Sequence, residues 1–129
     1  MAAIKSYSDL EQSRKLAKIL PLESADMLWE QHFAEPYVTI KPWTTRGKSI
    51  GGHCLPCWSL TALLGVIKKY GLIDLRFLSS TFDGRGEHLM NVWCCTFDNI
   101  NTVSFDIYAD NPLDACYELI LKLHELNLL

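Results

Sequence analysis

Apolar residues recur with a helical period near the start of the chain. Between residues 8 and 20 they fall on one stripe, and the charged residues face the opposite side. Ser8 and Glu11 have the spacing of a capping box, in which each side chain binds the other residue's backbone N–H. Pro21 ends the pattern because its ring disfavours a helical conformation at the preceding residue. We therefore predict a first amphipathic helix over residues 8–20.

Two further segments have a helical pattern. In residues 111–126, Asn111 is suited to the N-cap and Pro112 to the first helical position, and apolar residues line one face. Residues 57–70 form the other segment, and no charged residue occurs between positions 60 and 67. A helix without a polar face is typical of the protein interior. We therefore predict a buried central helix and an amphipathic C-terminal helix.

Short runs rich in β-branched and aromatic residues predict the strands. They cover residues 25–31, 37–41, 73–82, 88–97 and 102–108. The last three are consecutive and joined by short segments of turn-forming residues, a pattern typical of an antiparallel meander. The fold class expected is α+β. We expect one antiparallel sheet of about five strands, with the three helices packed mainly on one face.

Composition and charge narrow the classes of function. The chain has 129 residues, of which 49% are hydrophobic and 21% charged, values that suit one domain over residues 1–129. The net charge is −3 and no run of Lys or Arg exceeds two residues, so we expect neither nucleic-acid nor membrane binding. The first residues lack the apolar core of a secretion signal. We therefore expect a cytoplasmic protein with five reduced cysteines.

The segment around Cys57 suggests one candidate chemistry. Residues 54–62 are similar to the nucleophile helix of papain-like enzymes, in which a Cys-Trp pair opens a buried helix. That resemblance implies Cys57 as nucleophile, and a thiol at a helix start has a lowered pKa. His88 is then the candidate base and Asp106 the group that orients it. The glutamine that those enzymes place six residues before the nucleophile is Gly51 here, so the oxyanion donor is missing.

The same segment suggests a metal or redox site. His53, Cys54 and Cys57 place three soft ligands within one turn. The fourth ligand of a tetrahedron would be His88, Cys94 or Cys95. Structural zinc sites normally have a second ligand pair at a recognisable spacing, and a thioredoxin-like dithiol follows a strand, whereas a polar loop is predicted before Cys54. We therefore expect no metal and no cofactor.

The interpretation that we favour places Cys57 and Trp58 in the core. Free cysteine is among the residue types most often buried. Cys57, Leu60 and Leu64 would share one helix face, and Trp58 would cover a neighbouring patch. On this interpretation the segment 54–59 is a packing element.

Aromatic residues gather around the first predicted hairpin and the polar loop at residues 43–53. They are Trp29, Phe33, Tyr37 and Trp43. Exposed aromatics are frequent anchors of protein interfaces. We therefore predict a non-enzymatic interaction or regulatory module, which binds a protein partner or self-associates through this surface. The alternative is a thiol hydrolase with Cys57 as nucleophile.

Three longer segments resemble a family of small uncharacterised proteins of gut bacteria and their mobile elements. They are residues 16–27, 56–60 and 111–125. The resemblance implies a bacterial origin and extends over nearly the whole chain, least well over residues 70–103. It implies no activity.

Overall fold

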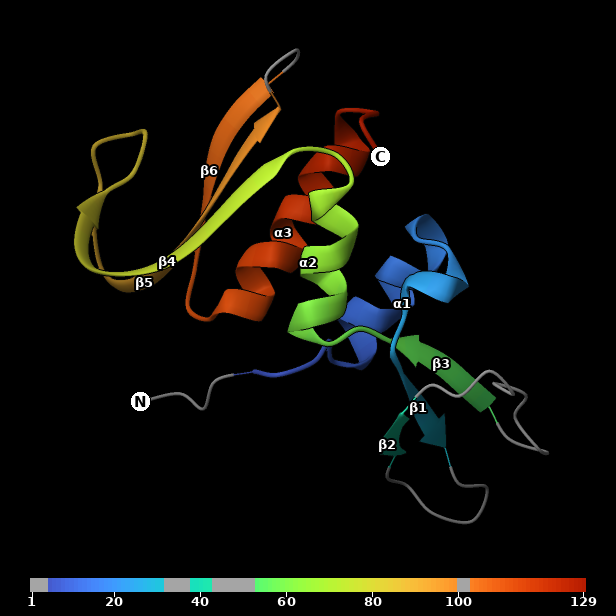
Figure 1. The fold of residues 1–129 in the computed structure, drawn as a ribbon. Helices are drawn as coiled ribbons and strands as arrows, with labels where there is room; N and C mark the ends of the chain where they lie inside the picture. Colours follow the sequence, from blue (N-terminus) through green and yellow to red (C-terminus); the bar gives the residue numbers. More distant parts are fainter. Residues whose placement is uncertain (1–4, 32–37, 43–52, 100–102) are drawn as a thin grey trace.

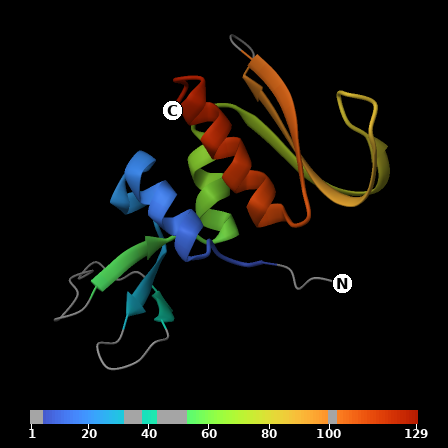
Figure 2. The same ribbon diagram turned by 180° about the vertical axis from the view of Figure 1, so that it is seen from behind.

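The computed structural model describes residues 5–31, 38–42, 53–99 and 103–129. A layer of helices lies between two small sheets, one at each end of the molecule (Figures 1 and 2). In chain order the elements are α1 (Leu10–Ile19), the 3₁₀ helix η1 (Leu22–Ser24), β1 (Met27–Gln31), β2 (Val38–Pro42), β3 (His53–Cys57), α2 (Leu60–Lys68), β4 (Leu72–Phe82), β5 (His88–Asn99), β6 (Val103–Ala109) and α3 (Pro112–Glu125). The predicted α+β class is confirmed.

The prediction of a single sheet is wrong. The described strands form two antiparallel sheets of three strands, in the orders β2-β1-β3 and β4-β5-β6. The first predicted hairpin does not join the later meander, because β3 covers the second edge of β1. Strand β3 is not predicted from the sequence, because Pro56 and the polar start of this segment are unfavourable in strands. The predicted meander is confirmed, with β5 between β4 and β6.

Helix α1 begins one residue later than the predicted capping box requires. Asp9 is the N-cap: its Oδ1 accepts a hydrogen bond from the Gln12 N–H at 2.8 Å, and its own N–H donates to Gln12 Oε1 at 3.1 Å. The proposed pair of Ser8 and Glu11 is therefore wrong. Ser8 is completely buried and its hydroxyl binds the backbone of Trp58. The Ser8 hydroxyl is bonded in the interior, so the half-buried Asp9 caps the helix instead.

Helix α2 begins at Leu60, three residues after the predicted start. Ser59 is its N-cap, with Oγ accepting from the Ala62 N–H at 3.1 Å. Cys57 ends β3 and so lies outside the helix, which removes the helix-start argument for a lowered thiol pKa. The helix is also less enclosed than predicted: Leu63 and Ile67 are fully buried, whereas the opposite side is exposed.

Helix α3 agrees with the sequence prediction. Asn111 caps it by accepting from the Asp114 N–H at 2.8 Å, and Pro112 takes the first position. Its inner face packs against α2 and against Cys95 and Phe97 of β5. The fully buried side chains of this helix are Leu113, Ala115, Cys116, Leu119, Ile120 and Leu123. Within the described residues, no helix has the length and apolar character needed to cross a membrane.

Candidate functional site

Cys57 is sealed into a junction of the N-terminal segment, β3 and the start of α2. Its exposed fraction is 0%, and its Sγ donates to the Ser8 carbonyl oxygen at 3.4 Å. The Ser8 hydroxyl lies 3.6 Å from that sulfur, accepts from the Trp58 N–H at 3.0 Å and lies 2.7 Å from Ser13 Oγ. The interpretation of Cys57 and Trp58 as core residues is confirmed, since neither is exposed. We call Ser8, Ser13, Cys57 and Trp58 the junction.

The junction keeps the Cys57 thiol protonated. Burial raises the pKa of Cys57 above its ordinary value, and hydrogen bonds from Ser8 and Ser13 only partly oppose that effect. A nucleophilic cysteine must lose its proton, and an environment that raises its pKa disfavours the thiolate. The chemical setting of Cys57 is therefore that of a structural thiol.

The structure does not bring together Cys57, His88 and Asp106. His88 begins β5, where its Nε2 lies 2.7 Å from Ser80 Oγ. Asp106 lies on β6 opposite Thr96, whose hydroxyl donates to it at 2.7 Å. His88 pairs with Phe82 next to the turn, whereas Thr96 pairs with Asp106 eight positions further along β5. The base and its proposed orienting group therefore lie at different places on the sheet, and Cys57 belongs to neither neighbourhood.

Trp29 is the one member of the predicted aromatic surface that can be placed. It is half-buried, its Nε1 donates to the Ser8 carbonyl at 3.1 Å, and its ring meets that of Tyr7 edge-on at 5.8 Å. Trp29 therefore anchors the first sheet to the N-terminal segment. Phe33, Tyr37 and Trp43 lie outside the described residues.

Of the predicted metal ligands, the structure describes the side chains of some but not of others. The side chains of His53 and Cys54 lie outside the described part of the structure. Among the side chains that are described, no group of three His, Cys, Asp or Glu residues could hold a metal ion. Cys95 lies in the core against Cys116, and this contact together with burial raises the Cys95 pKa. Cys94 is also buried, with its sulfur 3.7 Å from Thr96 Oγ1.

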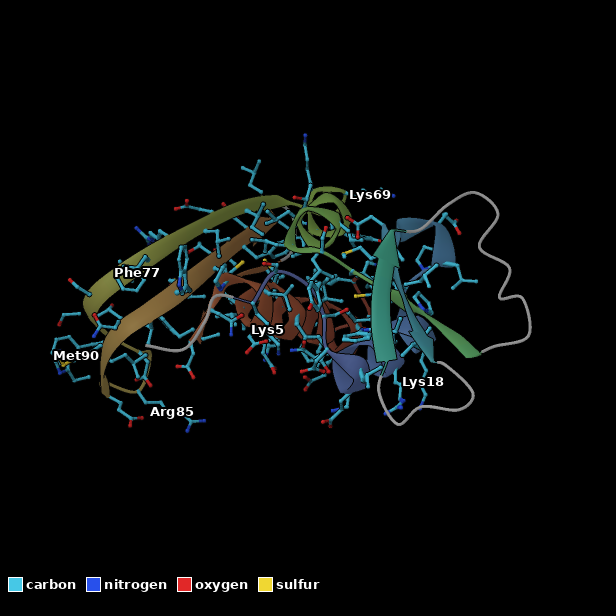
Figure 3. The ribbon with its side chains drawn as sticks, turned by 90° about the horizontal axis from the view of Figure 1, so that it is seen from below. Lys5, Lys18, Lys69, Phe77, Arg85 and Met90 are labelled. Atoms are coloured by element: carbon cyan, nitrogen blue, oxygen red, sulfur yellow. The ribbon has the colours of Figure 1, made fainter. Side chains whose placement is uncertain are left out.

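Sequence reasoning missed the exposed end of the hairpin formed by β4 and β5, residues 80–90, which we call the hairpin tip. Phe82 is 65% exposed and Met90 63% exposed. The turn between them is ordered by Asp83, whose Oδ1 accepts from the N–H groups of Arg85 and Glu87, each at 2.9 Å. Figure 3 places Arg85 and Met90 at the end of the molecule opposite Lys18. The tip therefore presents large apolar side chains on a well-bonded turn.

An open cavity of about 710 Å³ lies beside the hairpin tip. Leu89 and Ile107 contribute apolar surface to it. Its acidic lining residues come from the tip, the end of β6 and the start of α3, and they are Asp83, Asp106, Asp110, Asp114 and Glu118. The rim of this cavity is therefore strongly negative.

Asp114, one of these acidic residues, forms an ion pair with Lys5. Lys5 Nζ lies 3.0 Å from Asp114 and 2.9 Å from Asp9. Burial alone would raise the pKa of Asp114, but hydrogen bonds from Gln12 and Lys5 outweigh it and lower the pKa below its ordinary value. This pairing ties the N-terminal segment to α3 and accounts for only part of the cavity's charge.

Comparisons with protein-family models, with curated proteins and with solved structures returned no match. The resemblance of three segments to a family of gut bacteria therefore stays a prediction.

Proposed function

We propose that this domain is a non-enzymatic protein-interaction module that binds its partner at the hairpin tip. The observation that carries the proposal is the exposure of Phe82 and Met90 on an ordered turn. Large apolar side chains presented on a rigid element lose little conformational entropy on binding and can act as interface anchors.

The chemistry around the tip defines the partner. Asp106, Asp110 and Glu118 line the neighbouring cavity, and the turn itself adds Asp83 and Glu87. Opposite charge accelerates encounter and disfavours acidic competitors. We therefore expect the partner to offer a segment in which Lys or Arg flanks an apolar side chain, which would contact Phe82 or Met90.

A random dodecapeptide library displayed on phage tests this function and requires no candidate partner. Selection on the full chain should enrich basic sequences with an apolar residue, and a synthetic copy should bind more weakly at high salt. The double variant Phe82→Ser/Met90→Ser should bind about tenfold more weakly or worse, as expected for loss of a buried anchor.

Leu22→Ser is the matched control, because Leu22 is 54% exposed on η1 and lies outside the hairpin tip. This variant should bind the selected peptide like the unaltered chain. An absence of enrichment, or a peptide that binds the double variant equally well, would remove the proposal.

A thiol-hydrolase function receives no comparable support. The Cys57 sulfur is buried and bonded within the junction, and His88 contacts Ser80 and Phe82. A nucleophile requires a base within hydrogen-bond reach. We therefore advance the interaction module alone.

A further inference from the structure

Strand β4 forms an edge of the second sheet. It pairs with β5 along one side, and the sheet order places it outermost among the described strands, as Figure 3 also shows. An outer strand exposes backbone N–H and C=O groups that another strand can bind. At eleven residues β4 is long for an edge, and Leu72–Phe82 contains no proline, glycine or lysine that would discourage such pairing.

The exposed side chains of β4 combine apolar and charged groups. Leu72 is 65% exposed and Phe77 51% exposed. Between them, Asp74 and Arg76 have side chains that are 67% and 56% exposed. Arg76 Nε lies 3.9 Å from Asp74 Oδ2, at the outer limit of an ion pair, so each charge can still bind a second partner.

The order of these residues is self-complementary. In an antiparallel pair of identical strands related by a two-fold axis at Leu75, Asp74 of each strand faces Arg76 of the other. On the same face, Leu72 then meets Leu78, and on the opposite face Ile73 meets Phe77. Every charge would meet its opposite and every apolar side chain another apolar one.

Neighbouring registers lack this match. An axis at Asp74 or at Arg76 would bring two like charges directly opposite each other, which is destabilising in a sheet. An axis at Phe77 would place Asp74 opposite Ser80 and leave Arg76 facing Leu78. The charge pattern therefore selects the register centred on Leu75.

We infer that two copies of this chain associate through β4, antiparallel about Leu75, into one continuous sheet of six strands. The occupant of the edge is a second copy because the pattern of Asp74 and Arg76 is complementary to itself. The residues that pair in this register, 72–78, include neither Phe82, at the far end of β4, nor Met90 of β5. The inference therefore stands or falls independently of the proposed function.

Charge reversal with sedimentation velocity tests the inference on the full chain. The unaltered protein should be dimeric at concentrations on the order of 100 µM, where a micromolar interface is largely occupied. Asp74→Arg and Arg76→Asp should each weaken the dimer about tenfold or more, because the symmetry repeats every like-charge contact. The double variant Asp74→Arg/Arg76→Asp should dimerise like the unaltered chain, since the swap keeps the two charges complementary.

A mixture of the two single variants gives the sharpest result. Neither should dimerise well alone, yet an equimolar mixture should form a heterodimer, because each positive pair then faces a negative pair. Glu11→Arg on α1, whose side chain is 81% exposed, is the control and should leave the dimer unchanged. Circular dichroism verifies that every variant folds. A monomeric unaltered chain, assemblies larger than a dimer, or single variants that dimerise undiminished would overturn the inference.

Discussion

The junction around Cys57 and the edge strand β4 differ in where their polar groups find partners. In the junction, the Ser8 hydroxyl binds Trp58 N–H and Ser13, and the Ser8 carbonyl accepts from Cys57 and Trp29. On β4 the charged side chains face water and a backbone edge has no partner strand among the described residues. The polar groups of the junction form their hydrogen bonds within one chain. The backbone groups along the edge of β4 are available to bind another molecule.

This difference separates residues that hold the fold from residues available for binding. Buried polar groups must be paired within the protein because water cannot reach them. The segment around Cys57 resembles an active site in composition, yet the Cys57 thiol and the Trp58 N–H form their hydrogen bonds with buried Ser8. Among the described residues, the hairpin tip and β4 are two surfaces that remain open for binding.

Alkylation of Cys57 should depend on opening of the fold. Because its thiol is buried and its pKa raised, we expect iodoacetamide to label it roughly a thousandfold more slowly than in the unfolded chain. Labelling per peptide by mass spectrometry, before and after denaturant, measures this ratio. Cys116, also completely buried, is the internal reference. Labelling of Cys57 far ahead of Cys116 at neutral pH would revive the thiol-hydrolase hypothesis.

Truncation of Trp58 should damage the junction strongly. The ring is completely buried and its Nε1 donates to Ser24 Oγ at 2.9 Å. Trp58→Ala should lower the free energy of unfolding by about 3–5 kcal/mol. Phe82→Ala, which removes another large ring but an exposed one, should change it by less than about 0.5 kcal/mol. Urea unfolding followed by circular dichroism gives both values, and similar losses would contradict the distinction between junction and tip.

Removal of the Ser8 hydroxyl should cost less, but still measurably. Ser8→Ala leaves the buried Trp58 N–H without its acceptor, which should lower the free energy of unfolding by about 1–3 kcal/mol. Ser80→Ala is the matched control, because its hydroxyl binds exposed His88 and water can replace it. The same urea titration applies. A junction variant as stable as the control would show that the hydrogen bonds of Ser8 are dispensable.

Acid should weaken the contact of Lys5 with Asp114 slightly. The pKa of Asp114 is lowered in the fold from its ordinary value of 3.8, so its stabilisation is present above that value and is lost as pH falls through the folded pKa. Between about pH 5 and about pH 3, Asp114→Asn should lose less stability than the unaltered chain. The difference should stay below about 1 kcal/mol because water screens this partly exposed pair. Thermal unfolding across that range measures it; equal slopes would contradict the linkage.

Local sequence signals predicted some elements well. The start of α3 follows from Asn111 and Pro112, and the meander follows from turn chemistry between strong strand formers. Strand β3 was not foreseen, because a segment containing His53 and Pro56 lacks strand propensity and is held in place by pairing with β1. The N-cap of α1 is Asp9 and not Ser8 for a similar reason. The Ser8 hydroxyl accepts a hydrogen bond from the N–H of Trp58, which is distant in the sequence.

The candidate site shows the same division. The sequence predicts Cys57 and Trp58 as core residues from residue type, and both are buried. The helix face that Cys57 was expected to share with Leu60 and Leu64 does not exist, because Cys57 ends β3. The sequence could not predict where His88 and Asp106 lie relative to Cys57. Those positions depend on how the two sheets lie around the helices.

By itself, the sequence determined the α+β class, the helix α3 and the meander, because periodicity, caps and turns are local properties. Tertiary structure alone decided that the strands form two sheets, that Ser8 closes the junction, and that Phe82, Met90 and the edge of β4 remain exposed. Exposure and strand pairing are set by which distant segments cover each other. A linear pattern does not contain that information.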